Sequence, residues 1–278
     1  MKKISAVFDG LKLSDSTMQY AISITEKSKA LLSGVFMESF LYHSFKSFDM
    51  VGRHGISATK LKNLLDEDKD TRGESAEVFK KACEKHHINY TIHHADNFAL
   101  PSLLKESIYS DLLIINAGET MNHFEENVPT AFVRDVLAET QCPVLVVPEV
   151  YEEIKRLVLF YDGGPSSVFA IKMLNYTMPW MRNLETEVVF ITADQKADDI
   201  PDDALIREFI TCHYPHAKYT ILKGDAEVEI PAYLKSASNT LAVLGAYQRG
   251  AVSRMFKTSM ADILMTQVGV PLFIAHNQ

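Results

Sequence analysis

The sequence predicts an α/β protein made of two tandem doubly wound domains, and three observations lead to this fold class. The first is the length of 278 residues, which is enough for two domains of about 140 residues each. The second is an internal repeat, in which the two halves present similar blocks in the same order. The third is that each block is short, apolar and rich in β-branched residues, as in strands buried on both faces of a parallel sheet.

The repeat consists of five pairs of blocks. Their offset is 153 or 154 residues for the first two pairs and 129 or 128 residues for the last three. The pairs are residues 4–10 and 157–163, 35–38 and 189–192, 90–96 and 219–225, 112–115 and 241–244, and 142–146 and 270–274. Because five blocks in one order are hard to obtain by chance, we interpret the halves as copies of one domain.

Helical segments separate these predicted strands. Residues 14–29 place apolar side chains at helical spacing behind small polar residues that can cap a helix, and residues 166–176 do the same in the second half. Alternating strands and helices require right-handed crossovers and a doubly wound sheet. Ligands of such sheets bind beyond the carboxyl ends of the strands.

The repeat also predicts the domain boundaries. We expect domains at 1–150 and 154–278, each with a five-stranded, mostly parallel sheet flanked by helices, joined by a short linker near 148–155. The fall in offset indicates about 25 extra residues in the first half, between residues 39 and 89. This insertion is aromatic and His-containing at first and then charged and helix-prone, and we expect it to cover the cleft of the first domain.

Composition excludes several classes of function. The formal charge of −8 and the dispersed basic residues argue against nucleic acid as a partner. Asp9 follows the N-terminus too early for a signal peptide, and no apolar run approaches the roughly 18 residues of a membrane span. The three cysteines, Cys83, Cys142 and Cys212, are widely spaced without a CxxC motif, which disfavours disulfides and zinc. A cytoplasmic location is predicted.

No catalytic or metal-binding constellation is evident. The ten histidines include His93 and His94, but adjacent residues of a strand point to opposite faces and cannot easily share one ion. The sequence contains no GxSxG, P-loop or GxGxxG motif. We therefore predict no catalytic residues and no metal ligands.

The strongest local pattern follows the fourth predicted strand of the second half, at residues 245–259. This segment resembles the phosphate-binding signature of the universal stress protein family, Gly-x2-Gly-x9-Gly-Ser/Thr, with Gly245 and Ser259 in place and with Gln248 and Thr258 where glycines are expected. Glycines allow backbone amides to approach phosphate closely, and a following helix N-terminus favours an anion. The resemblance covers both halves and implies a tandem member with the adenine-nucleotide alpha-hydrolase-like fold.

The resemblance implies an adenine nucleotide, ATP or AMP, in the second domain, with Mg²⁺ bound only together with the nucleotide. Asp162 would contact the adenosine part, Ile191 or Thr192 would line the adenine pocket, and Arg249 would face the phosphates. The implied cofactor-binding residues are Asp162, Gly163, Ile191, Thr192, Gly245, Arg249, Gly250, Thr258, Ser259 and Met260. Two structural alternatives remain open: Asp-Gly is common turn chemistry, and the loop can be a solvated basic segment.

The equivalent loop of the first half differs in charge. Residues 116–126 include three carboxylates, and Thr130-Ala131 replaces Gly-Ser before the helix. Carboxylates repel a triphosphate, and the side chain of Ala131 has no hydrogen-bond donor. We predict that the first domain does not bind ATP in the manner of the family.

The resemblance implies a stress-response regulatory protein, expected in the cytoplasm, that binds ATP or AMP in its second domain. The resemblance also implies that the last strands, residues 144–147 and 272–275, bring the two domains together, and the chain is expected to form a homodimer as well. One alternative is a nucleotide-independent interaction scaffold with the same fold. The other is a weak ATP hydrolase, for which no nucleophile or base is evident.

Overall fold

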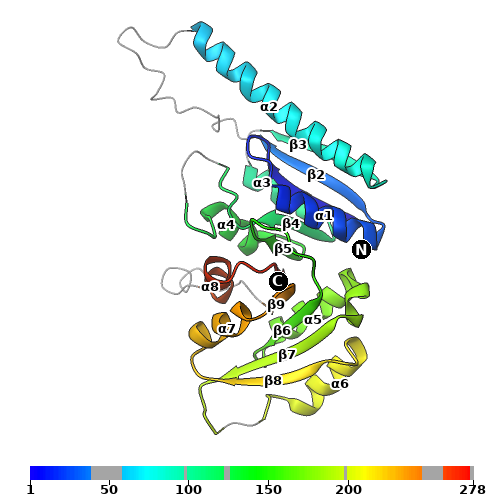
Figure 1. The fold of residues 1–278 in the computed structure, drawn as a ribbon, viewed down its shortest axis with the longest axis vertical. Coiled ribbons are helices and arrows are strands. Elements are labelled where there is room, and N and C mark those ends of the chain that lie inside the picture. The colour runs from blue at the N-terminus through cyan, green and yellow to red at the C-terminus, as the bar shows by residue number, and fades with distance from the viewer. Residues whose placement is uncertain (39–57, 97–98, 122–125, 197–198, 246–258, 276–278) are drawn as a thin grey trace. The chain divides into compact units, whose positions relative to one another are not determined.

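The computed structural model describes residues 1–38, 58–96, 99–121, 126–196, 199–245 and 259–275. Contacts between Cα atoms divide the chain into two compact units, Lys2–Gln141 and Cys142–Gln278. Each unit alternates strands and helices along the chain, as the repeat predicts (Figure 1). The candidate residues Arg249, Gly250 and Thr258 lie outside the described residues, as does the first part of the insertion.

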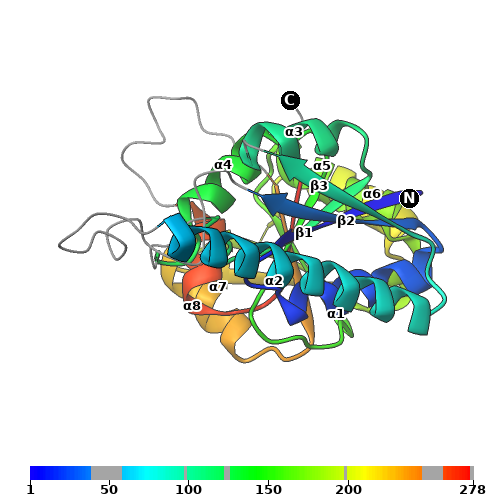
Figure 2. The same ribbon diagram turned by 90° about the horizontal axis from the view of Figure 1, so that it is seen from above.

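The first unit is a parallel sheet in the order β3-β2-β1-β4. Helices α1 and α2 cover one face of this sheet, and α3 and α4 cover the other (Figure 2). Its elements are β1 (Lys3–Asp9), α1 (Asp15–Ser28), β2 (Leu31–Glu38), α2 (Ala58–Lys85), β3 (Tyr90–Asp96), α3 (Ala99–Ile108), β4 (Leu112–Asn116) and α4 (Ala131–Glu139).

The second unit has the sheet order β5-β10-β9-β6-β7-β8, in which only β5 runs antiparallel to its neighbour, β10. The fifth strand of the first repeat thus pairs with the fifth strand of the second. The elements are β5 (Val144–Val147), β6 (Arg156–Tyr161), α5 (Pro165–Thr177), the 3-10 helix η2 (Pro179–Asn183), β7 (Glu185–Thr192), α6 (Asp203–His213), β8 (Lys218–Lys223), α7 (Ala226–Lys235), β9 (Thr240–Gly245), α8 (Met260–Gln267) and β10 (Leu272–Ala275).

The central strands are apolar without alternation because helices cover both of their faces. Every residue of β10 is buried, as are five of the six residues of β9 and six of the seven residues of β1, as expected for strands in the middle of a doubly wound sheet. Helix α1 begins where predicted, since the hydroxyl of Ser14 accepts the N–H of Thr17 at 3.2 Å. It ends at Lys29, which adopts a left-handed conformation with φ of 56°.

Helix α2 docks on the first sheet through its C-terminal half. The ring of Phe79 is fully buried and lies over Gly34 of β2, where an added Cβ would come within 2.7 Å of the ring. Phe8 and Phe36 surround the same ring at centroid distances of 5.6 and 5.9 Å. Gly34 therefore provides the space that the aromatic cluster needs, and burial of Phe79 contributes about 2–3 kcal/mol.

In the described ranges no helix combines the length and apolar character that a membrane span requires. All three cysteines are free: Cys83 is buried, Cys142 is half-buried and Cys212 is exposed. Burial raises the pKa of the Cys83 thiol to about 12, so this thiol is chemically inert at neutral pH.

Candidate functional site

A cavity of about 240 Å³ opens at the carboxyl ends of β6, β7 and β9 in the second unit. This is the edge at which doubly wound sheets bind ligands. Its walls are mostly apolar, with a few polar groups from the strand ends and from the start of α8. The lining residues are Phe160, Tyr161, Asp162, Ser167, Val189, Ile191, Ala226, Ile230, Leu244, Gly245, Ser259, Met260, Ala261 and Ile274.

Asp162, directly after β6, lines this cavity and also stabilises the local turn. Its Oδ1 accepts the N–H of Gly164 at 2.8 Å and the hydroxyl of Ser167 at 2.7 Å. Within the described residues its Oδ2 has no hydrogen bond. The turn chemistry and the ligand-binding role are therefore compatible, because they use different oxygens of one carboxylate.

Gly245 closes β9 and lies against the first turn of α5. A Cβ at this position would come within 2.3 Å of the carbonyl carbon of Ser166 and of the amide nitrogen of Ser167. Real Cβ atoms do not approach backbone this closely, so glycine is required for β9 and α5 to pack. The close packing of strand and helix is thus a sufficient reason for the first glycine of the loop.

Ser259 is the N-cap of α8. Its hydroxyl oxygen accepts the N–H of Asp262 at 3.0 Å, which leaves the hydroxyl hydrogen available to a ligand. Ser259 and Met260 both line the cavity. The positive end of the α8 dipole therefore lies at the cavity, as an anionic ligand group requires.

The structure distinguishes between two residues that the sequence left as alternatives. Ile191 lines the cavity, whereas Thr192 does not. The hydroxyl of Thr192 instead accepts the N–H of Asp194 in the turn after β7. Gly163 also lies away from this cavity: it has a φ of 79° and lines a different groove, together with Gly164.

Some lining residues had not been predicted. Ser167 is one of them. Its position near the start of a helix, five residues after Asp162, could have indicated that it lies beside Asp162. Ala226 and Ile230 of α7 also line the cavity. Their spacing of about one helical turn predicts that they share one face of the helix, but it does not predict a ligand. Sequence alone gives no reason to place that face beside the strand ends.

The corresponding place in the first unit is filled by protein groups. The carboxylate of Glu126 accepts the N–H of Ala131, the first residue of α4, at 2.7 Å. Thr130 caps the same helix by accepting the N–H of Val133 at 3.2 Å. An anion of the chain itself thus takes the position at this helix N-terminus that a phosphate would need.

Helix α2 lies beside the Asp9-Gly10 turn of the first unit. The hydroxyl of Ser75 donates to the carbonyl oxygen of Gly10 at 2.8 Å. The Arg72 side chain packs over Gly10, with its Cγ 3.0 Å from where a Cβ would stand. Asp9 is almost fully buried, and its Oδ1 accepts the N–H of Leu11. The second part of the insertion therefore packs on the turn that would bind adenosine.

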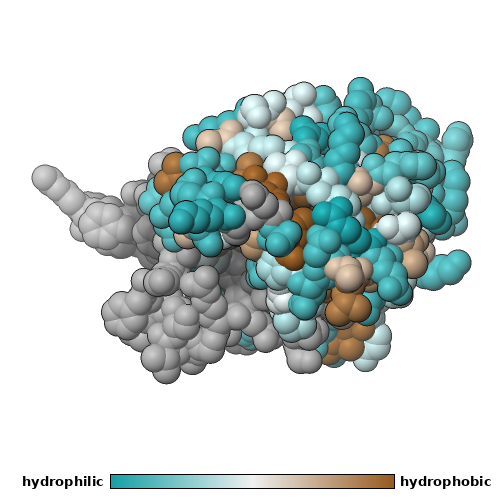
Figure 3. Space-filling model, turned by 90° about the horizontal axis from the view of Figure 1, so that it is seen from below, coloured by the Kyte–Doolittle hydropathy of each residue, from teal (hydrophilic) through white to brown (hydrophobic). Residues whose placement is uncertain are grey.

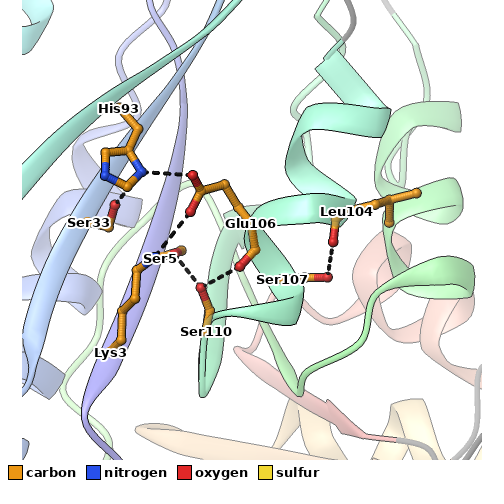
Figure 4. A network of polar contacts seen from close by, with 8 residues as sticks. All are labelled: Lys3, Ser5, Ser33, His93, Leu104, Glu106, Ser107 and Ser110. Atoms are coloured by element: carbon orange, nitrogen blue, oxygen red, sulfur yellow. Dashed lines mark hydrogen bonds and ion pairs between the residues drawn. The ribbon is translucent and has the colours of Figure 1, made fainter.

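The histidines of β3 lie on opposite faces of the sheet. Nδ1 of His93 is 2.8 Å from Oε1 of Glu106 on α3 and 3.3 Å from the hydroxyl of Ser33 (Figure 4). His94 stands 6.1 Å from the ring of Phe36, on the other face. A catalytic relay needs its serine and its carboxylate on different ring nitrogens. Here both contact Nδ1, so the cluster is a structural network.

This network continues along the face that α3 covers. Nζ of Lys3 lies 3.2 Å from Oε2 of Glu106, and the hydroxyls of Ser5 and Ser110 are 2.7 Å apart (Figure 4). The second unit has a network at the equivalent place: the carboxylate of Glu187 accepts from Arg156, from Tyr233 at 2.6 Å, and from Thr220. Among the described residues no group of three or more His, Cys, Asp or Glu could hold a metal ion.

The topology and the cavity define a class of protein, a tandem doubly wound α/β protein with a cavity at the carboxyl ends of the strands of its second unit. No model of a protein family matches the sequence, and no curated protein matches it. Solved structures do match along the whole chain.

A universal stress protein from Archaeoglobus fulgidus DSM 4304 has a TM-score of 0.72 and 14% identity, and the match covers 99% of this chain and 98% of that one. A protein of unknown function from Pseudomonas aeruginosa PAO1 has a TM-score of 0.62 and 14% identity, with 99% and 92% covered. The chain has the fold of a tandem universal stress protein, which confirms the fold class predicted from the sequence.

Proposed function

We propose that the chain is a regulatory stress-response protein whose second unit binds an adenine nucleotide, ATP or AMP. The observation that carries the proposal is that one cavity is lined by residues from the separate segments chosen from the sequence, namely Asp162, Ile191, Gly245 and Ser259–Met260. The Oδ2 of Asp162, which has no hydrogen bond to a described residue, is an acceptor for ribose hydroxyls, and Ile191 supplies an apolar wall for a base.

The volume of the cavity limits how much of a nucleotide it can hold. At about 240 Å³ it is smaller than the roughly 300–1,000 Å³ of typical ligand pockets. We therefore assign it to the base and ribose, with the phosphates extending toward the start of α8. Any Mg²⁺ would bind with the phosphates. The regulatory role, the cytoplasmic location and homodimer formation belong to the same proposal.

Calorimetric titration of ATP with Mg²⁺ tests the proposal directly. Ile191→Trp fills the cavity from its apolar wall, whereas Thr192→Val changes the next residue, which does not line it. We expect one site per chain, an affinity at least about tenfold weaker in Ile191→Trp, and no change in Thr192→Val. Thermal unfolding of both variants checks that they are folded.

Two outcomes would contradict the proposal. One is the absence of heat up to millimolar nucleotide, which would favour the interaction scaffold. The other is unchanged binding by Ile191→Trp, which would place the nucleotide elsewhere. ATP turnover by the wild-type chain that Asp162→Asn abolishes would instead favour the weak hydrolase.

A further inference from the structure

A second and larger cavity lies on the other side of the β6–α5 turn. It is a groove of about 650 Å³ between the start of α5 and helix α6, and it shares only Tyr161 with the nucleotide cavity. Its apolar walls are formed by Pro165 and Val168 of α5 and by Leu205, Ile206 and Phe209 of α6. Leu205 is 69% exposed although it is a large apolar residue. The face drawn in Figure 3 carries hydrophobic patches among hydrophilic side chains.

Comparison of the two repeats shows that, among the described residues, the second unit has this groove where the first unit has a packed helix. In the first unit, Ser75 and Arg72 of α2 lie directly on Gly10. The equivalent glycine of the second unit is Gly163, and the side chain nearest to it is that of Pro201, in the turn before α6. The space beside the turn is thus filled by a helix in one unit and left open as a groove in the other.

Two carboxylates line the groove without a cation. Asp202 precedes α6 but its side chain caps no amide, and Glu208 projects from the same helix. Neither carboxylate forms a hydrogen bond or an ion pair with any described residue. Arg207, between them in sequence, turns away: its Nε is 2.8 Å from both carboxylate oxygens of Asp203, and its guanidinium lies 4.4 Å from the centroid of Tyr219.

The remaining titratable groups of the groove do not supply the missing positive charge. Nδ1 of His213 accepts from the amide of Asn175 at 2.9 Å. Burial, with Lys172 and Arg182 nearby, lowers the pKa of His213, so its ring is neutral at pH 7. Cys212 is an exposed free thiol, and Tyr161 donates its hydroxyl to the carbonyl of Pro201. The described residues that line the groove are therefore mostly apolar, and the charged ones among them are Asp202 and Glu208.

We propose that the groove between α5 and α6 is a binding site for a small amphipathic cation, that is, a protonated amine on an apolar or aromatic body. The volume is within the range of pockets for small molecules. Val168, Leu205 and Phe209 cover the apolar body, and Asp202 and Glu208 pair with the ammonium group, since a cation is held in a partly apolar site only where it is paired.

Alkylation of Cys212 provides a local measurement, because this thiol lines the groove. The probe is 1-naphthylmethylamine, compared with 1-naphthylmethanol, which is neutral, and 1-naphthoate, which is anionic. The rate of reaction of Cys212 with iodoacetamide is followed by peptide mass spectrometry in the full-length chain. Cys83, which is buried, is the internal control for unfolding. The amine should slow the reaction of Cys212 saturably, and the carboxylate should not.

Variants test the assignment of the charge. Asp202→Asn with Glu208→Gln should weaken binding of the amine by about tenfold, which corresponds to the loss of two partly exposed ion pairs, and should leave the alcohol unchanged. Asp203→Asn, which removes the carboxylate that pairs with Arg207, is the matched control and should behave as wild type.

Three results would overturn the proposal: no protection by the amine at millimolar concentration, equal protection by 1-naphthoate, or unchanged affinity in the double variant. Because the measurement uses no nucleotide, its result is independent of whether the second unit binds ATP.

Discussion

Among the described residues, the carboxyl group of Asp162 forms hydrogen bonds through one oxygen only, so its structural role can be separated from its proposed binding role. Oδ1 stabilises the turn through Gly164 and Ser167. An asparagine at this position keeps one acceptor oxygen for the turn but replaces the second oxygen with an amide donor. An alanine loses both.

We predict that Asp162→Asn changes the free energy of unfolding little and still weakens ATP binding by about tenfold, because a charged hydrogen bond to the ligand is lost. Asp162→Ala should in addition destabilise the second unit by about 1 kcal/mol, since the turn loses its acceptor. Urea unfolding and calorimetry separate the two effects. Equal affinities of wild type and Asp162→Asn would exclude Asp162 from the site.

At the scale of the residue, the sequence predicts which segments line the site, but not which of their atoms face the ligand. Asp162, Gly245 and Ser259 were chosen from the resemblance to the universal stress protein family, and all three line the cavity. The choice between Ile191 and Thr192 depends on which side chain faces the cavity at the end of the strand. A shift of the strand by one residue would exchange the two side chains. The cap formed by Glu126 depends on an irregular loop, for which no periodic pattern exists.

At the scale of the element, the docking of α2 depends on the absence of a side chain at Gly34. A methyl group there would press on the ring of Phe79, which Phe8 and Phe36 prevent from moving aside. Gly73, in the same helix, meets no atom within 4 Å of an added Cβ and is exposed. The two glycines should therefore respond to substitution in opposite directions.

We predict that Gly34→Ala destabilises the first unit by about 1–3 kcal/mol through overpacking, whereas Gly73→Ala stabilises it by about 0.5–1 kcal/mol through helix propensity. Both changes can be measured by urea unfolding monitored by circular dichroism. A stabilising Gly34→Ala would mean that α2 does not pack on β2 as described.

The elements themselves were predicted well because their signals are local. The apolar runs of the strands and the polar cap at Ser14 are visible in the sequence, and the strands and α1 form there. The groove beside α6 was not predicted. It depends on the distance between α5 and α6, which are separated in sequence by a strand. From the sequence alone, Val168 and Leu205 are interpreted as apolar residues of ordinary amphipathic helices.

At the scale of the whole molecule, pH should act on the two units differently, because their networks contain different groups. Burial raises the pKa of the Glu187 carboxyl, but hydrogen bonds from Thr220, Tyr233 and Arg156 outweigh burial and lower the pKa below its ordinary value of 4.5. A lowered pKa in the folded state means that the carboxylate stabilises the fold at neutral pH. This contribution is lost as the pH falls from about 4.5 through the pKa of the folded state.

We predict that Glu187→Gln lowers the free energy of unfolding by about 2 kcal/mol at pH 7 and that the difference from wild type narrows below about pH 4.5. Glu185→Gln is the control, since the Glu185 carboxylate is 60% exposed and lies 3.6 Å from Lys218, and such pairs contribute little. Unfolding curves at pH 7, 5 and 3.5 test this. A constant difference across this range would contradict it.

The two charged networks have a consequence for how the chain folds. Tandem copies of one domain risk misassembly, in which a helix of one copy docks on the sheet of the other. In the first unit the acidic group comes from helix α3, as Glu106, and the sheet provides Lys3 and Ser33. In the second unit the sheet carries Glu187, at the position equivalent to Ser33, and helix α7 provides the neutral Tyr233. Helix α3 on the wrong sheet would set Glu106 against Glu187, and α7 on the wrong sheet would leave Lys3 without its carboxylate. The divergence of the repeats is thus expected to favour docking of each helix on its own sheet.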